Sequence, residues 1–311
     1  MKTSLDHLPH RKQRELARIV EVLHEEFEDA LKEGTAEFKK RGRILKIILF
    51  GSYARGTWVD EPHTKKGYKS DYDLLIIVNN KKLTDFATYW HKAQDRLLRL
   101  QDVETPVNFI VHSRREVNTA LREGQYFFVD IRKEGIVLYE MDDEPLAMPK
   151  PLGPSDAYEI SRNYFVNRSP DLRLLLETGG FQIERARQDA EWRKHAAFTL
   201  HQAIERSYSV VLLTLTSYSP PSHNLKHLRQ LAEDRDQRLV DVWPRDRQRY
   251  SAWFNAINEA YVKARYSDYY EISQEALDWL AERVEVLTAQ VKTICKEHLE
   301  RLRIQVDSAD G

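Results

Sequence analysis

Short apolar runs alternate with amphipathic stretches in the first half of the chain. The β-rich runs are Ile44–Phe50, Asp71–Val78, Pro106–Val111 and Ile136–Tyr139. Helical periodicity before and between these runs predicts helices over Arg11–Lys40, Leu83–Leu100 and Arg115–Glu123. Strands that alternate with helical segments are typical of a layered structure of sheet and helices.

The second half shows only helical periodicity, over Trp192–Tyr218, Arg247–Tyr266 and Ala276–Ile304. Between the halves, the stretch from Met141 to Pro154 holds four of the 11 prolines and no apolar period. Proline fixes φ and donates no backbone N–H, so this stretch marks a boundary. We therefore predict an α+β chain with a first domain over residues 1–142, a proline-rich linker over 143–154 and an all-α helical bundle over 155–305.

Composition narrows the class of protein. The 311 residues suit two domains, and 41% apolar residues suffice for real cores. A net charge of -1 rules out a generic basic nucleic-acid coat. The single Cys295 excludes an intramolecular disulfide and a cysteine-built zinc site. Every apolar run is far shorter than the roughly 20 residues of a membrane span, so we expect no membrane partner and a cytoplasmic location.

Two short motifs follow the first apolar run. Gly51 lets the backbone approach a ligand closely, and a helix that starts at Ser52 would aim free N–H groups at an anion. Asp71 and Asp73 are two residues apart, which places both carboxylates on one face of a strand. Paired carboxylates repel each other unless a cation lies between them, and Mg²⁺ commonly joins carboxylates to phosphates. In this order the motifs favour a nucleoside triphosphate site over a structural turn followed by a capping Asp.

The segments Gly51-Ser-Tyr-Ala-Arg-Gly56 and Ser70-Asp-Tyr-Asp-Leu74 resemble the DNA-polymerase-β-type nucleotidyltransferase superfamily, and within it the minimal nucleotidyltransferases. The resemblance covers roughly residues 40–140. It implies a small mixed sheet flanked by helices, ATP or another nucleoside triphosphate as substrate, and two Mg²⁺ ions bridged by Asp71 and Asp73. The nucleotide-binding residues that it implies are Gly51, Ser52, Arg55 and Ser70.

Two departures from that pattern bear on catalysis. The spacer before Asp71 is long and contains an apparent inserted loop, 60–67, in which Lys65 and Lys66, with Lys69 beyond it, either contact phosphates or are simply solvated. Asn108 stands near the position of the family's third carboxylate. Asparagine can ligate through oxygen but cannot act as a general base. The alternative carboxylates for this role are Asp102, Glu104 and Asp130.

The helical half resembles the HEPN family, which is often paired with nucleotidyltransferase domains. The matching pieces are His195–Leu215, Ser222–Leu225 and Tyr261–Tyr266, within residues 155–300. Some HEPN proteins are ribonucleases that carry Arg, four to six residues, then His. None of the five histidines after the linker has that arginine, and the one fitting pair, Arg18 and His24, belongs to the other domain. The resemblance also implies a homodimer formed through the helical domain.

Other residues of the helical half have a functional and a structural interpretation. His223 and His227 could share a zinc ion, but a helix cap and a surface histidine explain them better. The group around Tyr261, Lys263 and Arg265 either packs a helix end or holds phosphates, and one of its tyrosines could accept AMP. Three tryptophans are expected in the bundle core or at a helix interface: Trp192, Trp253 and Trp279.

We conclude from the sequence that the chain is a Mg²⁺-dependent nucleotidyltransferase that moves a nucleoside monophosphate, AMP from ATP, to a hydroxyl group of a protein, an RNA or a small molecule. The acceptor would enter between the two domains. The family resemblance places such a protein in toxin–antitoxin or defence systems. Two alternatives stay open: a nucleotide-binding regulator with little or no turnover, and a HEPN ribonuclease.

Overall fold

The computed structural model describes residues 1–32, 35–61, 68–267 and 269–309. The chain forms two compact units whose boundary falls between Pro151 and Leu152. Residues 141–153, all described, contain no helix or strand, because three prolines and the polar residues around them offer neither a ladder nor an apolar face.

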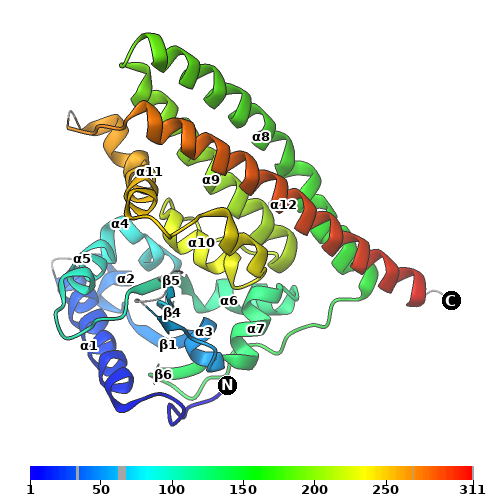
Figure 1. The fold of residues 1–311 in the computed structure, drawn as a ribbon. Coiled ribbons are helices and arrows are strands. Elements are labelled where there is room, and N and C mark those ends of the chain that lie inside the picture. The colour runs from blue at the N-terminus through cyan, green and yellow to red at the C-terminus, as the bar shows by residue number, and fades with distance from the viewer. Residues whose placement is uncertain (33–34, 62–67, 268, 310–311) are drawn as a thin grey trace. The chain divides into compact units, whose positions relative to one another are not determined.

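The first unit is built on a four-stranded sheet with the order β5-β4-β1-β6 (Figure 1). Its strands are β1 (Ile44–Phe50), β4 (Tyr72–Val78), β5 (Val107–Ser113) and β6 (Ile136–Glu140). β4 and β5 are parallel, whereas β1 is antiparallel to both β4 and β6. The predicted α+β class and the small mixed sheet are therefore confirmed.

The helices of the first unit are shorter than the sequence predicted. The expected helix over Arg11–Lys40 is α1 (His10–Lys32) and a separate α2 (Glu37–Lys40). The expected helix over Leu83–Leu100 is divided among η1 (Lys81–Thr84), α4 (Phe86–Tyr89) and α5 (His91–Arg99), because Asn80 and Asp85 each cap a new helical start. The others are α3 (Gly51–Arg55), α6 (Arg114–Arg122) and α7 (Tyr126–Glu134), of which α7 was not predicted.

A short antiparallel pairing joins β2 (Asp60–Glu61), at the start of the apparent inserted loop, to β3 (Tyr68–Lys69), just after it. Lys65 and Lys66 lie outside the described residues, so the alternatives of phosphate contact and a solvated loop both stay open for them.

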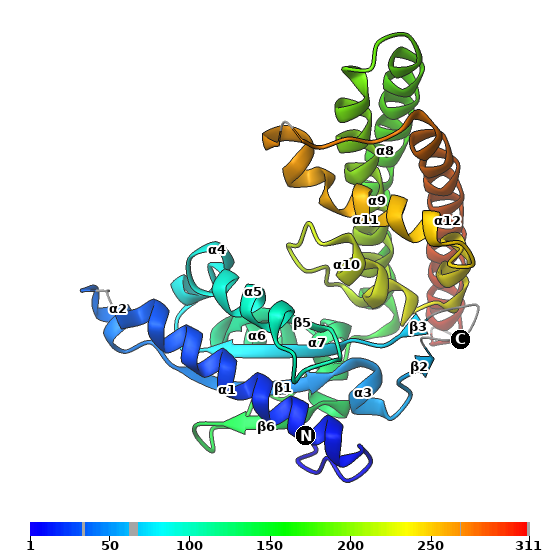
Figure 2. The ribbon, with the colours of Figure 1, turned by 60° about the vertical axis from the view of Figure 1, so that its left-hand side comes forward.

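Helices cover both faces of the sheet, and the two central strands are buried along their whole length. One face, with Ile47, Leu49 and Ile76, packs against the apolar side of α1. Figure 2 shows α1 lying along this sheet. α6 and α7 pack against the central strands from the other side. Burial on both faces explains why these strands appear in the sequence as continuous apolar runs rather than as an alternating pattern.

The second unit is a helical bundle around α9 (Trp192–Thr216), which packs against the other long helices of the unit. The remaining helices are α8 (Pro154–Gln188), α10 (Leu225–Glu233), η2 (Gln237–Val242), α11 (Gln248–Tyr266) and α12 (Gln274–Ala309). No described helix has both the length and the apolar character needed to cross a membrane.

α8 is the largest element that the sequence did not predict. Pro170 stands inside it, and Gly179 and Gly180 follow nine residues later, so local propensity indicates interruptions. The helix buries few residues along its 35 positions, which leaves a weak periodic signal. Its packing against α9 and α12 supplies the stability that the local sequence lacks.

The three tryptophans are half-buried rather than central to the core. Trp253 of α11 contacts Trp279 of α12 with ring centroids 5.5 Å apart, and Trp192 contacts Phe181 of α8. Of the two expected locations, the bundle core and a helix interface, the structure shows the helix interface.

Candidate active site

The sheet brings the two sequence motifs to one place. In the antiparallel pairing of β1 with β4, Phe50 lies opposite Asp73, so the Gly51 that follows Phe50 lies beside that aspartate. In the parallel pairing of β4 with β5, Asp73 lies opposite Asn108. Three strands thus place Gly51, Asp73 and Asn108 side by side at one edge of the sheet.

The two aspartates lie on one side of their strand, as their spacing predicts. Tyr72 between them points to the α1 face, where its hydroxyl donates to Glu15 Oε2 at 3.1 Å. Asp73 is buried, whereas Asp71, just before β4, is half-buried. Asn108 Nδ2 donates a hydrogen bond to Asp71 Oδ2 at 2.9 Å, so the amide occupies the third position around the carboxylates.

Gly51 is required by its contact with Asp73. Its φ is +73°, in the left-handed region, and a Cβ built on it would lie 2.5 Å from Asp73 Oδ2. Any other residue would push the carboxylate away. The next side chain, Ser52, is buried, and its Oγ has no hydrogen-bond partner among the described residues. A buried hydroxyl beside a close-packed carboxylate is the kind of group that a polar ligand satisfies.

A buried polar network supports this site from the α1 side. Lys12 Nζ donates to Thr105 Oγ1 and lies 3.7 Å from Glu15 Oε2. The ammonium also lies over the rings of Tyr53 and Tyr72, at 5.7 and 5.9 Å from the centroids. Burial raises the pKa of Tyr53 to about 12 and raises the pKa of Tyr72 further, so both phenols are neutral near pH 7. The residues on either side of the reactive motifs are therefore fixed by packing.

Comparisons with known proteins agree with this geometry. Residues 33–144 match the family described as "Polymerase beta, Nucleotidyltransferase". Over 114 residues the chain is 38% identical to a protein of Methanocaldococcus jannaschii named "Putative protein adenylyltransferase", a region that is 37% of this chain and 92% of that protein. The chain belongs to the polymerase beta nucleotidyltransferase family. Residues 172–296 of this nucleotidyltransferase match the HEPN domain.

Both family resemblances seen in the sequence are thereby confirmed, and so is nucleotidyl transfer as the general activity. The structure adds how each predicted residue of the nucleotidyltransferase site lies. Arg55 is exposed at the end of α3. Ser70 is buried, and its Oγ accepts a hydrogen bond from the Val59 N–H at 3.0 Å. That bond connects the segment after α3 to the start of β4. Ser70, which the resemblance predicts to bind nucleotide, therefore has a structural role as well.

The alternative carboxylates are used in other ways. Asp102 and Glu104 precede β5 and form ion pairs with Arg18 and Arg11 of α1, at 3.7 and 2.9 Å. Asp130 is a half-buried residue of α7. Asn108 is the residue that the described contacts place against Asp71.

The donor set fits Mg²⁺. Asp71, Asp73 and Asn108 offer oxygen ligands only, and Mg²⁺ is usually held by one or two carboxylates together with substrate phosphates and water. In the described part of the chain, no group of three or more His, Cys, Asp or Glu side chains is arranged to hold a metal ion. A site with two carboxylates therefore depends on the substrate's phosphates to complete it.

In the helical unit the histidines do not form the zinc pair that their spacing allowed. His227 is fully buried in α10, and burial lowers the pKa of its imidazole to about 4. His223 precedes the helix, donates from Nδ1 to Glu205 Oε2 at 2.9 Å, and stacks on Tyr261 with ring centroids 3.5 Å apart. The expected surface histidine is thus a buried one, while Asn224 is the helix cap.

The aromatic group at the end of α11 contains both packed and exposed members. Tyr270 is buried and donates its hydroxyl hydrogen to the Ala256 carbonyl, as expected for a packed helix end. Arg265 lies over the rings of Phe198 and Tyr261, and Lys263 pairs with Glu259 at 2.8 Å. Tyr266 and Tyr269 are exposed.

Sequence reasoning missed the network of Lys12, Glu15 and Thr105. Lys12 and Glu15 are three residues apart on an amphipathic helix, and both are charged, so the pattern assigns them to solvent. One feature of the sequence indicates such a network: Tyr53 and Tyr72 stand within the two motifs, and buried phenols need hydrogen-bond partners.

Proposed function

We propose that this protein transfers AMP from ATP to a hydroxyl group of a protein acceptor. The observation that carries the proposal is the register that places Gly51, Asp73 and Asn108 side by side, with Asp71 bonded to Asn108. A protein acceptor is favoured over RNA or a small molecule by the name of the relative that shares the nucleotidyltransferase domain.

In this reaction an acceptor oxygen forms a bond to the α-phosphorus, and the bond from that phosphorus to the bridging oxygen of pyrophosphate breaks. Backbone N–H groups at the start of α3 and the Ser52 hydroxyl would hold the triphosphate. Asp71 and Asp73 would hold Mg²⁺, which when bound neutralises phosphate charge and orients the α-phosphorus. The acceptor proton passes to Asp71 or to water, since the Asn108 amide cannot accept it.

The arrangement contributes mainly by positioning. The contact between Asp73 Oδ2 and the space above Gly51 fixes one carboxylate against the phosphate-binding turn. The hydrogen bond from Asn108 fixes the other carboxylate, which lies at the end of a strand. Groups that are held before the substrate arrives contribute to the rate without a further cost of ordering.

The test is incubation of the full chain with Mg²⁺ and ATP labelled at the α-phosphate, together with a cell extract as the source of acceptors. We expect pyrophosphate release and label on protein, both lost in Asp71→Ala/Asp73→Ala. The matched control is Asp102→Ala/Glu104→Ala, which removes two exposed carboxylates of the same unit and should retain the activity. Label that persists in the Asp71→Ala/Asp73→Ala variant would overturn the proposal, and label that appears on RNA alone would overturn the protein acceptor.

A second candidate function, a nucleotide-binding regulator, is favoured by one observation: an amide stands where a third carboxylate would serve as base. The variant Asn108→Asp separates the two functions. For an enzyme adapted to asparagine, the aspartate removes the N–H donor to Asp71 and the rate falls. For a regulator, ATP binds without pyrophosphate release in the natural chain, and release appears in Asn108→Asp.

A further inference from the structure

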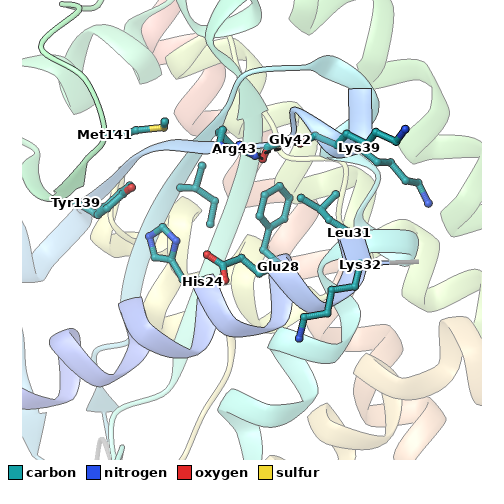
Figure 3. Close-up of a pocket in the computed structure, with 12 residues that line it drawn as sticks. His24, Glu28, Leu31, Lys32, Lys39, Gly42, Arg43, Tyr139 and Met141 are labelled. Atoms are coloured by element: carbon teal, nitrogen blue, oxygen red, sulfur yellow. Dashed lines mark hydrogen bonds between the residues drawn. The ribbon is translucent and has the colours of Figure 1, made fainter. Parts of the chain in front are cut away.

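A pocket of about 580 Å³ lies at the end of the sheet away from the candidate active site. Its walls come from α1, α2, the start of β1 and the end of β6, all within the first unit (Figure 3). Pockets of a few hundred Å³ are the usual size for small-molecule sites. The function proposed above does not use this pocket.

The pocket is remote from the reacting groups. Arg43 precedes β1 and Gly51 follows it, so the two sites are at opposite ends of this strand. At about 3.3 Å per residue they are roughly 25 Å apart. One mononucleotide cannot occupy both sites, and a ligand bound in the pocket does not reach the phosphates at Gly51.

The inner wall of the pocket is apolar and aromatic. Phe27 is buried and stacks on Trp90 with centroids 4.8 Å apart, which fixes its position. Tyr139 contacts the His24 ring edge-on at 4.3 Å, and Leu31 and Ile44 complete the apolar lining. Burial lowers the pKa of His24, so this imidazole is neutral near pH 7 and belongs to the uncharged wall. Such a wall favours a flat, apolar ring.

The rim of the pocket is cationic. Glu28 is the acidic side chain among the lining residues. Four lining residues are basic: Lys32, Lys39, Lys40 and Arg43. Lys32 pairs with Asp29 at 3.2 Å, and Arg43 Nη1 is directed to the Gly42 carbonyl at 2.6 Å. Lys39 contacts an aromatic ring: its Nζ lies 5.4 Å from the centre of the Tyr89 ring. This contact does not neutralise the charge of the ammonium group. In a chain with a net charge of -1, this local excess of positive charge favours an anionic ligand.

We propose that this pocket binds a small phosphate ester of a flat ring, of which the mononucleotides are the principal class. The ring would lie against Tyr139 and Leu31, which the buried Phe27 supports from behind, and the phosphate would contact the ammonium of Lys39 and the guanidinium of Arg43. Neither half of the ligand suffices for tight binding. A bare phosphate leaves the apolar wall exposed to solvent, and an uncharged nucleoside forms no ion pair with the cations of the rim. The site is thus a second nucleotide site, separate from the one at Gly51.

The test uses the full chain carrying Asp71→Ala/Asp73→Ala, without divalent metal, so that the first site contributes as little as possible. Titration calorimetry is run with each of the four nucleoside 5′-monophosphates, with 1-naphthyl phosphate, with adenosine and with ribose 5-phosphate. We expect saturable binding of at least one mononucleotide at one site per chain. Adenosine and ribose 5-phosphate should bind at least about tenfold more weakly, the equivalent of one charge-assisted hydrogen bond or one buried ring face.

Variants locate the site. Lys39→Glu/Arg43→Glu in the same background should weaken mononucleotide binding at least about tenfold. The matched control is Lys92→Glu/Arg99→Glu, which reverses two exposed charges of α5 outside the pocket and should leave binding unchanged. Naphthyl phosphate that binds as tightly as every mononucleotide would mean that the site takes aryl phosphates in general, which keeps the site but removes its selectivity for nucleotides.

Three results would overturn the proposal. They are the absence of saturable binding for all phosphate esters, equal binding of ribose 5-phosphate and a mononucleotide, and equal weakening by the pocket variant and the α5 control. None of them bears on pyrophosphate release by the natural chain, so the two proposals fail separately.

Discussion

Replacement of Gly51 by alanine isolates the contact between the phosphate-binding turn and Asp73. The substitution adds one methyl group, and two effects follow from it. A non-glycine residue at φ +73° carries a strain of about 1–2 kcal/mol. In addition, the new Cβ would lie 2.5 Å from Asp73 Oδ2, so the carboxylate must move by about 1 Å to reach an ordinary contact distance.

The two effects predict different losses. The strain lowers the free energy of unfolding by about 1–2 kcal/mol, which in a protein of this size is a fall in Tm of roughly 2–8 °C. A displacement of about 1 Å in a reacting group can reduce the rate by about 100-fold. Gly51→Ala should therefore lose most of its pyrophosphate release while remaining folded at 25 °C.

Gly56→Ala is the matched control. Gly56 ends α3 with φ +78°, so alanine has the same backbone strain there, but the nearest atom to its Cβ would be His7 Cδ2 at an ordinary 3.6 Å. We expect a similar fall in Tm and a rate within a few-fold of the natural chain. Both variants are measured by thermal unfolding and by pyrophosphate release with saturating ATP. Equal rates in the two variants would refute the reasoning that the Gly51–Asp73 contact sets the site.

Two further perturbations test the packing behind the site and in the bundle. Lys12→Met leaves the buried Glu15 with the more exposed Arg11, at 3.7 Å, as its cationic partner, and should lower the free energy of unfolding in urea by about 1–3 kcal/mol. Lys12→Met/Glu15→Gln should cost less, because it leaves no buried carboxylate; a less stable double variant would contradict this. His227 is buried with a pKa of about 4, so below pH 6.5 the unfolded chain takes up a proton that the folded chain does not, and stability falls as the pH falls toward 4. His227→Leu should remove up to about 3 kcal/mol of that loss, seen as a smaller difference between urea unfolding at neutral and at mildly acidic pH; identical pH profiles would exclude the burial as its cause.

The sequence determined the elements whose signal is local. The runs from Ile44 to Phe50 and from Tyr72 to Val78 are strands because both of their faces are buried, and continuous apolar character shows this burial. Gly51 with Ser52, and Asp71 with Asp73, were recognisable because glycine freedom and period-two spacing are properties of the chain itself. The family and its general activity followed from these few residues.

Other features depended on contacts between distant residues. α8 contains Pro170 and two adjacent glycines, and it is a helix because α9 and α12 pack along it, which local propensity cannot show. Lys12 and Glu15 are buried because Tyr72 and Thr105, about 60 and 93 residues away, supply their partners. The cationic rim of the pocket at Arg43 is local in the sequence, between Lys32 and Arg43, but its aromatic wall joins Phe27 of α1 to Tyr139 of β6, about 110 residues away.

The position of Asn108 shows the division most clearly. The sequence shows an asparagine at position 108, near where the family resemblance predicts a third carboxylate, but its bond to Asp71 required the parallel register of β4 with β5. Such a register joins residues through a long connection, and its hydrogen bonds form only when the sheet does. A property that depends on residue type, such as the inability of an amide to act as a base, can therefore be predicted from the sequence. A property that depends on the distance between two residues requires the tertiary structure.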